Sequence, residues 1–472
     1  MGLKLFNTLS RSVQDFTPLH PGQNPVGFYC CGPTVYDFAH IGNWRTFVLG
    51  DLVRRTLELK GCSITHVMNI TDVDDKIIRR VRETRTSLCE FTARFEAAFF
   101  EDLKTLNCRM PHHTPRATEH IPEIVALIEK LLARGVAYRS ADGSVYFSIE
   151  HYQATGRRYG QLLKLKFDEM RPGQRVQSDE YAKESVADFA LWKARAPEDG
   201  EVFWPSPFGE GRPGWHVECS AMSMKILGPS FDLHLGGEDL VFPHHEDEIA
   251  QSEGATGQPF VKHWLHGAHL LVEGRKMSKS LGNFFTLRDL LARGFTGREV
   301  RYLLLTAHYR ETFNFTLDGL LGARAALGRI DECLGKLREI ATSPKSKPQS
   351  PRPDTSTLQR FNDALDDDLN ISAAWGVVFG WVREMNRRLA DHSLAPDEAA
   401  DALAAWEKMD SVLGVGAKTE AEAPAEILAL LEARQAARKA RDFKRADEIR
   451  DELKAKGWAI EDTPKGPKLK KI

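Results

Sequence analysis

The sequence predicts an α/β fold in which a doubly wound parallel sheet carries an inserted subdomain and is followed by a mostly helical C-terminal part. Three observations lead to this prediction. Residues 1–110 alternate apolar runs with an amphipathic helix, the order of a parallel β-α-β unit. Residues 138–214 contain short strand-like runs between Gly- and Pro-rich loops, which is typical of an insertion. After Gly282 the apolar residues recur with helical spacing.

The first half of the chain supplies the strands of the predicted sheet. A short apolar run at Gly27–Cys31 is bounded by Gly and Pro, and an amphipathic helix over Arg45–Lys60 separates it from a second strand at Cys62–Ile70. The glycine fingerprint GxGxxG is missing at the first turn, so a nucleotide would be held in another way. The other elements expected in this half are a helix over Thr118–Gly135 and strands over Phe231–Leu235 and His266–Val272.

The C-terminal part is predicted to be helical and to end in a basic segment. From Leu430 to Ile472 there are 13 Lys and Arg against 8 Asp and Glu, so this segment carries +5 and the rest of the chain −7. A basic tail on an acidic body is typical of binding to a polyanion, and a solvated helix with a frayed end is the alternative. Linkers are expected at Pro344–Pro353 and Gly414–Pro424, and helices over Leu317–Ile340, Ala373–Leu389, Asp401–Leu413 and Ala425–Lys456.

The composition is that of a soluble globular protein and excludes several other classes. The chain has 472 residues, of which 42% are hydrophobic and 28% charged, enough for about three domains. No apolar run approaches the roughly 20 residues of a membrane span, and the first residues lack the apolar core of a secretory signal. The seven cysteines are an odd number without a CxxC pair. We therefore expect a reduced, cytoplasmic protein without a membrane partner.

The segment His40-Ile41-Gly42-Asn43 lies between the first predicted strand and its helix. Gly42 lets a ligand approach the backbone closely, and Asn43 is a favourable N-cap residue. The free amides and the dipole at such a helix start attract phosphate, to which His40 can donate a further hydrogen bond. Taken alone, this tetrapeptide fits a structural turn better than a nucleotide site.

A second segment, KMSKS at residues 276–280, follows the strand predicted at His266–Val272. The ammonium groups of Lys276 and Lys279, on a loop of Ser and Gly residues, can neutralise charge that builds up on a triphosphate. A generic basic loop is the alternative, but five specified residues in a row favour a phosphate site.

Four side chains far apart in the sequence could together bind a metal ion. Cys31, Cys219, His244 and Glu248 offer two thiols, an imidazole and a carboxylate, a donor set that suits Zn²⁺. His244 and Glu248 are four residues apart and would share one face of a helix. Because neighbouring side chains of a strand point to opposite faces, only one of Cys30 and Cys31 should reach such a site. Buried free cysteines are also common without a metal, so spacing alone leaves both interpretations open.

Longer segments around these residues resemble one family. HIGN and KMSKS, in this order and each beside a predicted strand, are similar to the two signature motifs of class I aminoacyl-tRNA synthetases. The resemblance to cysteinyl-tRNA synthetases runs from Leu5 to the basic tail. Asn43 departs from the pattern, since many class I enzymes have a second histidine there. The segments that carry the narrower resemblance are YCCGPTVYD at 29–37, NITDVDDK at 69–76, PGWHVECSAM at 213–222 and FPHHE at 242–246.

The resemblance implies an organisation of the chain and an activity. The implied reaction joins L-cysteine to its cognate tRNA through a cysteinyl-adenylate formed from ATP with Mg²⁺. The implied parts are a Rossmann-like catalytic domain in two halves at 1–137 and 215–316, a connective subdomain at 138–214, a helical bundle at 317–415 and an anticodon-binding domain at 425–472.

The resemblance also implies roles for individual residues. The catalytic residues would be His40, Asn43, Lys276 and Lys279, of which His40, Asn43 and Lys279 would also bind ATP. The resemblance implies one Zn²⁺ per chain. The family pattern places one of its ligands immediately before a glycine, which selects Cys31. The other implied ligands are Cys219, His244 and Glu248. Thr71, Trp215 and His234 match the amino-acid pocket, and Arg438, Asp447 and Asp462 match residues that read anticodon bases. Leu469 stands where the family often has a tryptophan.

The implied zinc would separate cysteine from serine. A pocket that reads shape alone discriminates such small differences by only about 1–3 kcal/mol. A soft metal prefers a thiolate and lowers the pKa of a thiol, whereas the serine hydroxyl is a far poorer ligand. No hydrolytic editing domain would then be needed, and residues 138–214 are too few for one.

Two other functions compete with this interpretation. A ligase of the same fold joins cysteine to the amine of a pseudodisaccharide in mycothiol synthesis, but such ligases resemble a synthetase without the last domain. The second competing function is that of a non-catalytic paralogue that binds RNA, and the intact HIGN and KMSKS motifs argue against it. Cysteine-dependent exchange between ATP and pyrophosphate would separate an enzyme from such a paralogue.

Overall fold

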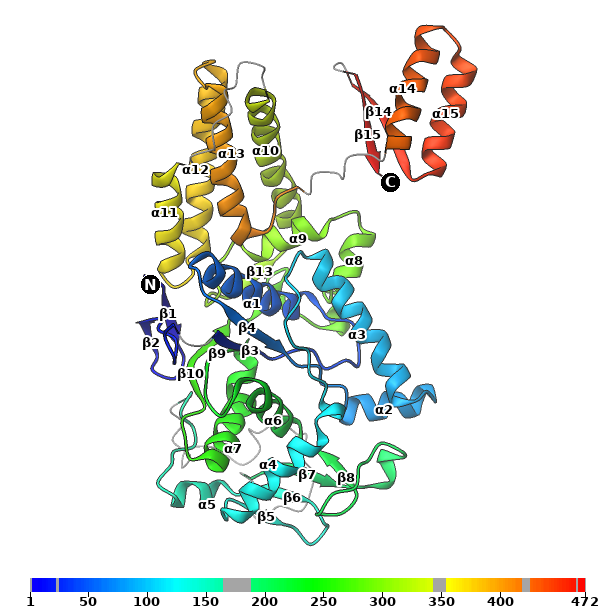
Figure 1. Cartoon of the computed structure of the whole chain (residues 1–472). Coiled ribbons are helices and arrows are strands. Elements are labelled where there is room, and N and C mark those ends of the chain that lie inside the picture. The colour runs from blue at the N-terminus through cyan, green and yellow to red at the C-terminus, as the bar shows by residue number, and fades with distance from the viewer. Residues whose placement is uncertain are drawn as a thin grey trace. The chain divides into compact units, whose positions relative to one another are not determined.

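The computed structural model describes residues 2–22, 25–163, 188–342, 354–417, 425–463 and 466–471 (Figure 1). It divides into two compact units, Met1–Val415 and Gly416–Ile472. Within the described ranges, no helix is both long and apolar enough to cross a lipid bilayer.

Four parallel strands form the central sheet of the first unit. The chain passes from β3 to β4 through a helix and later places β9 and β10 on the other side of β3, so the strand order reverses between β3 and β9. The α/β fold expected from the sequence is confirmed, and ligands of such sheets bind beyond the carboxyl ends of the strands at this reversal. In their order across the sheet, the strands are β10 (Val261–Gly267), β9 (Phe231–Gly237), β3 (Val26–Cys30) and β4 (Ile64–Met68).

Helix α1 (Ile41–Leu59) connects β3 to β4 and begins ahead of the predicted Arg45. The reason lies in its cap. The His40 side chain accepts a hydrogen bond from the Asn43 amide at 3.2 Å, and the Asn43 side chain accepts one from the His40 amide at 3.1 Å. This reciprocal pair is a capping box, so the expectation that Asn43 is the N-cap is wrong: the N-cap is His40.

The chain between β4 and β9 forms helices and a second, antiparallel sheet. Residues 164–187, in the middle of this region, lie outside the described ranges. One apolar cluster joins the sheet to the buried faces of α4, α6 and α7. The strands in order are β5 (Ala137–Arg139), β6 (Val145–Phe147), β7 (Phe189–Ala194) and β8 (Gly211–Pro213). The helices are α2 (Asp75–Thr84), α3 (Leu88–Thr105), α4 (Ile121–Ala133), α5 (Ile149–Ala154), α6 (Trp215–Leu227) and, after β9, α7 (Glu246–Thr256).

The single strand predicted at His266–Val272 is wrong, because two strands of different sheets share that stretch. β10 ends at Gly267, and β11 (Leu270–Val272) pairs antiparallel with β12 (Arg275–Lys276) and parallel with β13 (Phe313–Phe315). The KMSKS segment therefore leaves a small separate sheet. The remaining elements here are the turn η6 (Lys279–Leu281), the helices α8 (Leu287–Ala292) and α9 (Gly297–Leu304), and the N-terminal hairpin of β1 (Lys4–Asn7) and β2 (Ser12–Asp15).

Helices α10 to α13 stand together beyond α9 (Figure 1). Their buried apolar residues belong to the same cluster as those of α1, so the bundle and the central sheet share a core. The sequence pattern did not indicate α11, and the linker predicted at 344–353 lies outside the described ranges. The helices are α10 (Leu317–Ala341), α11 (Thr355–Asp366), α12 (Ile371–Ala390) and α13 (Pro396–Leu413).

The second unit is a pair of helices and a β-hairpin. The helical stretch predicted over Ala425–Lys456 is confirmed but consists of two helices, because Arg441 adopts a left-handed conformation (φ 61°) and Asp442 caps a new helix. The resulting elements are α14 (Ala425–Lys439), α15 (Phe443–Ala455), β14 (Trp458–Thr463) and β15 (Gly466–Lys471). The core of this unit is made by Ile427, Ile449, Leu453 and Trp458, and Leu469 packs against it.

Candidate active site

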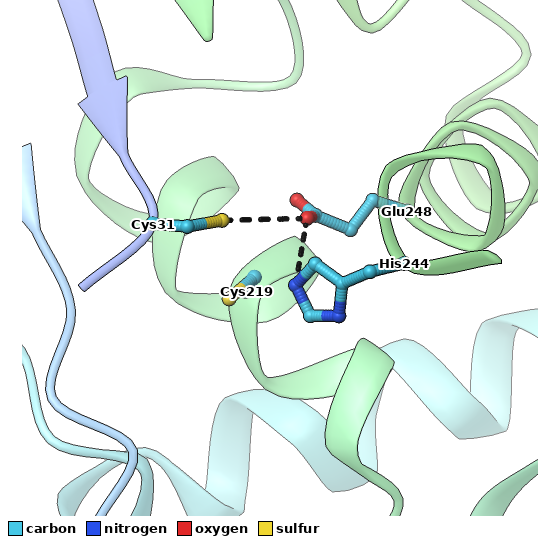
Figure 2. A group of neighbouring side chains, drawn as sticks. All are labelled: Cys31, Cys219, His244 and Glu248. Atoms are coloured by element: carbon cyan, nitrogen blue, oxygen red, sulfur yellow. Dashed lines mark hydrogen bonds and ion pairs between the residues drawn. The ribbon is translucent and has the colours of Figure 1, made fainter. Parts of the chain in front are cut away.

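The structure brings the four predicted metal ligands together. Cys31 follows the carboxyl end of β3, Cys219 lies on α6, His244 precedes α7 and Glu248 is on that helix. All four are buried, and one donor atom from each lies within 4.8 Å of the others. Figure 2 shows the Glu248 carboxylate between Cys31 and His244, with Cys219 on the adjoining helix. We call these four residues the donor cluster.

Hydrogen bonds orient the donor cluster. The Glu248 Oε1 atom lies 3.1 Å from His244 Nε2 and 3.9 Å from the Cys31 Sγ atom (Figure 2). The second ring nitrogen of His244, Nδ1, is held at 2.8 Å by His216 Nδ1. Nε2 is therefore the nitrogen that faces the cluster, and His216 stands where a metal-ligating histidine usually has its orienting partner.

Burial and mutual hydrogen bonds shift the pKa values of three residues of the donor cluster. Burial would lower the pKa of His244, but hydrogen bonds to Cys219 and Glu248 outweigh it and raise the pKa to about 10. Burial would raise the pKa of Glu248, but the charges and hydrogen bonds of His234 and His244 lower it to about 2. A hydrogen bond from Cys31, with help from His244, lowers the pKa of Cys219 to about 6. The residues thus share protons that a metal ion would displace, and two thiols, an imidazole and a carboxylate fit Zn²⁺.

Two further histidines adjoin the donor cluster. A second set of donors, Cys31, His234, His245 and Glu248, also lies within 4.8 Å. His234 Nε2 is 2.9 Å from the Glu248 Oε2 atom, and His245 Nε2 is 3.3 Å from the Cys31 Sγ atom. His245 also contacts His266 at 2.7 Å. The first set has both thiols and therefore suits Zn²⁺ better. His245 and His266 were not predicted from the sequence, in which the adjacent histidines of FPHHE are the signal for His245.

The three residues predicted for the amino-acid pocket lie around the donor cluster. Trp215, the first residue of α6, is 41% exposed, and its ring centre is 4.5 Å from that of His244. His234 is fully buried on β9. Thr71 is buried and accepts a hydrogen bond from the Asn69 side chain at 3.2 Å. Burial raises the pKa of Glu218, the residue before Cys219, and a hydrogen bond with Thr71 opposes this rise. Of these three residues, Trp215 is thus the one that is exposed to solvent.

The HIGN segment contacts the stretch that follows KMSKS, and Met277 of KMSKS lies near Gly42. The Ile41 amide donates to the Phe285 carbonyl at 2.9 Å, and the rings of His40 and Phe284 pack nearly perpendicular to each other with their centres 5.4 Å apart. A side chain at Gly42 would come within 3.1 Å of the His40 ring and 3.5 Å of the Met277 methyl group. Gly42 therefore leaves room for the close approach of the His40 ring, and a larger residue would require that ring to shift by a few tenths of an ångström.

Asn283 fixes the shape of the KMSKS loop. It is 9% exposed, its side-chain oxygen accepts from the Ser278 amide at 2.8 Å, and its amide donates to the Val272 and Lys276 carbonyls at 3.2 Å each. Lys276 is exposed on β12. The backbone of Lys279 is in turn η6, and its side chain lies outside the described part of the structure.

The three predicted anticodon-reading residues lie in the second unit. Arg438 is near the end of α14, and Asp447 on α15 pairs with Arg450 at 3.1 Å. Asp462 lies in β14, and its side chain is outside the described residues. Leu469 is opposite Ile460 in the hairpin and packs on the core of the unit.

Comparison with known proteins decides the family. A model of the class I (C) tRNA synthetase catalytic domain matches residues 16–325, a DALR domain matches 360–418, and a cysteinyl-tRNA ligase anticodon-binding domain matches 420–467. The cysteine–tRNA ligases of Chlamydia muridarum and Chlamydia trachomatis serovar A are 47% and 46% identical, each over 100% of both chains. The chain belongs to the cysteine–tRNA ligase family of class I aminoacyl-tRNA synthetases.

A further relative agrees with this assignment, and two solved structures share the fold. The cysteine–tRNA ligase of Protochlamydia amoebophila is 46% identical over 99% of this chain and 98% of its own. A Mycobacterium tuberculosis methionyl-tRNA synthetase in complex with methionyl-adenylate superposes with a TM-score of 0.59 at 14% identity, over 83% of this chain and 90% of that one. The LeuRS of Agrobacterium radiobacter, in a ternary complex with tRNA and LeuAMS, superposes with a TM-score of 0.60 at 12% identity, over 85% of each chain. These structures show that the chain has the class I fold.

Proposed function

We propose that the chain joins L-cysteine to the tRNA for cysteine in two steps. The cysteine carboxylate attacks the α-phosphorus of ATP, so that a carboxyl–phosphate bond forms and pyrophosphate leaves. A hydroxyl of the terminal adenosine of the tRNA then attacks the activated carbonyl, and AMP leaves. The family assignment supports this reaction, and the donor cluster is the single observation that points to cysteine as the substrate.

We propose further that Cys31, Cys219, His244 and Glu248 hold Zn²⁺ and that this site selects the substrate thiol. The ion would supply a soft Lewis acid that favours a thiolate over an alcohol. His216 would hold His244 in its ligating orientation, and Trp215 would close one side of the pocket. The shape of a pocket alone distinguishes serine from cysteine by about 1–3 kcal/mol, so recognition of the sulfur atom would supply the remaining discrimination.

The HIGN and KMSKS residues would stabilise the transition state at phosphorus. No protein nucleophile is required, because positioning and charge neutralisation drive this kind of displacement. His40 and the start of α1 would face the phosphates, with Asn43 holding the cap, while Lys276 and Lys279 would neutralise charge on ATP, which carries Mg²⁺. The position of Met277 beside Gly42, together with the hydrogen bond from Ile41 to Phe285 just beyond KMSKS, supports this division of labour.

The C-terminal parts would recognise the tRNA. We assign residues 1–137 and 215–316 to catalysis, 138–214 to the connective subdomain, 317–415 to the bundle and 425–472 to anticodon binding. Arg438, Asp447 and Asp462 would hydrogen-bond to the edges of unpaired bases, which is how single-stranded RNA is read. The Lys and Arg residues around them would add affinity that depends strongly on salt.

Two assays test the reaction. Cysteine-dependent exchange of pyrophosphate into ATP is expected, followed by transfer of labelled cysteine to the tRNA for cysteine. A sugar amine is expected to accept none. Exchange without transfer to tRNA would overturn the assigned acceptor, and the absence of exchange would overturn the assigned activity.

The substitution Cys219→Ser tests the metal site. We expect the purified wild-type chain to contain about one zinc per chain, and the variant to lose most of it because one of two thiolate ligands is gone. The measurement is metal content by atomic emission. The control is Cys62→Ser, a partly exposed cysteine outside the donor cluster. Full zinc content in Cys219→Ser would contradict the assignment.

A further inference from the structure

Helix α2 presents a dense group of positive charges to solvent. Within the described ranges a single ion pair, Arg80–Glu83 at 3.5 Å, offsets part of this charge, although residues 1–429 as a whole carry −7. Such a local excess of one sign on a body of the other sign attracts a polyanion. Five exposed residues make up the group, which we call the α2 basic face: Lys76, Arg79, Arg80, Arg82 and Arg85.

The opposite side of α2 is firmly anchored. Ile77 and Ile78 are buried. The Asp75 carboxylate pairs with Lys193 of β7 at 2.9 Å and with Arg212 of β8 at 2.5 Å. Burial would raise the pKa of Asp75, but these two cations outweigh it and lower the pKa. The negative charge of Asp75 is thus neutralised from within the protein, and α2 is a rigid support for the basic face.

Helix α2 begins at the edge of the candidate active site. Its N-cap, Asp74, follows Thr71 in the chain by three residues. The Lys76 ammonium lies 5.0 Å from the centre of the Tyr36 ring, in the loop that leads from Cys31 to His40. Arg82 donates to the Glu198 carbonyl in the turn η3 (Pro197–Asp199) at 3.2 Å. Helix α2 lies between α3 and the inserted sheet (Figure 1).

We propose that the α2 basic face binds phosphates of the acceptor arm of the tRNA as its 3′ end enters the site. The inference rests on the proposed function, because the terminal adenosine must reach the pocket and its neighbouring nucleotides must cross the rim. Arginines fixed on a helix suit phosphate, which they can grip with two parallel hydrogen bonds. Contacts to phosphate carry no sequence information, so this face adds affinity and orientation, while identity is read elsewhere.

The test is the triple substitution Arg79→Gln, Arg80→Gln and Arg82→Gln in the full-length chain. We expect the KM for tRNA in aminoacylation to rise by roughly tenfold. Its dependence on salt should weaken by about one logarithmic unit of slope for each phosphate that the variant no longer binds. Cysteine-dependent pyrophosphate exchange should stay within about twofold, because ATP and cysteine do not touch this face. Wild-type charging of tRNA is measured in parallel, so a failure of the proposed function would be visible separately.

A matched control removes the same charge elsewhere on the first unit. Lys130→Gln, Arg134→Gln and Arg158→Gln change three exposed cations on or near α4 and α5, and we expect the KM for tRNA to stay within about twofold. Direct binding then locates the contact: the α2 variant should lose affinity for an isolated acceptor-arm minihelix and keep its affinity for an isolated anticodon stem-loop. An unchanged KM in the α2 variant, an equal rise in the control, or weaker binding of the stem-loop instead of the minihelix would overturn the proposal.

Discussion

At the scale of single residues, the donor cluster derives its properties from groups that the sequence does not place beside it. His216 fixes the ring of His244, and His234 holds the Glu248 carboxylate. The residue types and the i, i+4 spacing left a metal site as one of two open interpretations, and the resemblance to cysteinyl-tRNA synthetases selected the four donors. The supporting histidines were not predictable in this way, because their contacts exist only once β9, β10, α6 and α7 have packed together.

His216→Ala tests this supporting role. We expect zinc affinity to fall about 10–100-fold, because His244 loses the partner that orients it, while the fold remains intact. The measurement is zinc retention against a graded chelator, with thermal unfolding measured alongside. His269→Ala, an exposed histidine at 61% side-chain exposure, is the control. Equal zinc retention in both variants would contradict a role for His216.

At the scale of elements, the start of α1 shows how a local detail decides a functional geometry. The sequence pattern located the helix and the strand before it, but it placed the helix start too late. Asn43 resembles an N-cap residue, whereas the side chains of His40 and Asn43 cap each other. The same limit applies to the stretch 266–272 and to the break at Arg441, since a bend or a left-handed residue leaves no periodic signal in the sequence.

Substitutions at Asn43 separate its structural from its chemical role. Asn43→Ala removes one bond of the capping box and should cost about 1 kcal/mol of stability, together with a lower rate of pyrophosphate exchange. Asn43→Asp keeps the acceptor for the His40 amide and should retain stability, but its negative charge opposes bound phosphate, so exchange should stay slow. The measurements are chemical denaturation and exchange kinetics. Full exchange activity in Asn43→Asp would show that this position does not face phosphate.

At the scale of the whole molecule, a buried charge network connects the helix that carries HIGN to the end of the bundle. Arg301 is fully buried, pairs with Asp51 of α1 at 2.6 Å and donates to the Leu413 carbonyl at the end of α13 at 2.7 Å. Arg55 pairs with the same carboxylate at 2.6 Å and donates to the Ser411 carbonyl. The last carbonyls of α13 are thus capped by arginines of α9 and α1, which fixes the bundle to the catalytic core.

Asp51→Asn should destabilise the first unit by about 3 kcal/mol, because it leaves two buried guanidinium groups without their shared partner. Burial would raise the pKa of Asp51, but Arg301 and Arg55 outweigh it and lower the pKa. The stabilisation is therefore fully present at neutral pH and is lost as the pH falls below the usual range of aspartate, so the difference between wild type and variant should shrink in acid. Denaturant unfolding at several pH values measures it. The control is Glu332→Gln, which removes an exposed ion pair with Lys336 and should change the free energy of unfolding little at any pH. If the difference in stability between wild type and Asp51→Asn grew in acid, this explanation would be contradicted.

The sequence was sufficient to predict the class of fold, the order of the main helices and the residues that could bind a metal, because these depend on periodicity and residue type. The β-hairpin of the second unit could not be predicted from the sequence, because its two short strands have weak hydrophobic patterns. The packing of Leu469 depends on this hairpin and was not predicted either. The sequence also contained no hint of the Asp51 network, since a buried charge is recognised only by what surrounds it.

The proposal that a metal ion in the donor cluster selects the substrate thiol is tested most directly with the wild-type chain, stripped of metal and then reloaded with zinc. Discrimination between cysteine and serine in pyrophosphate exchange is compared before and after, with circular dichroism to follow the fold. If the donor cluster selects sulfur through a metal, the preference for cysteine should fall by at least about 100-fold on stripping and return with zinc. An undiminished preference in folded, metal-free protein would contradict the account.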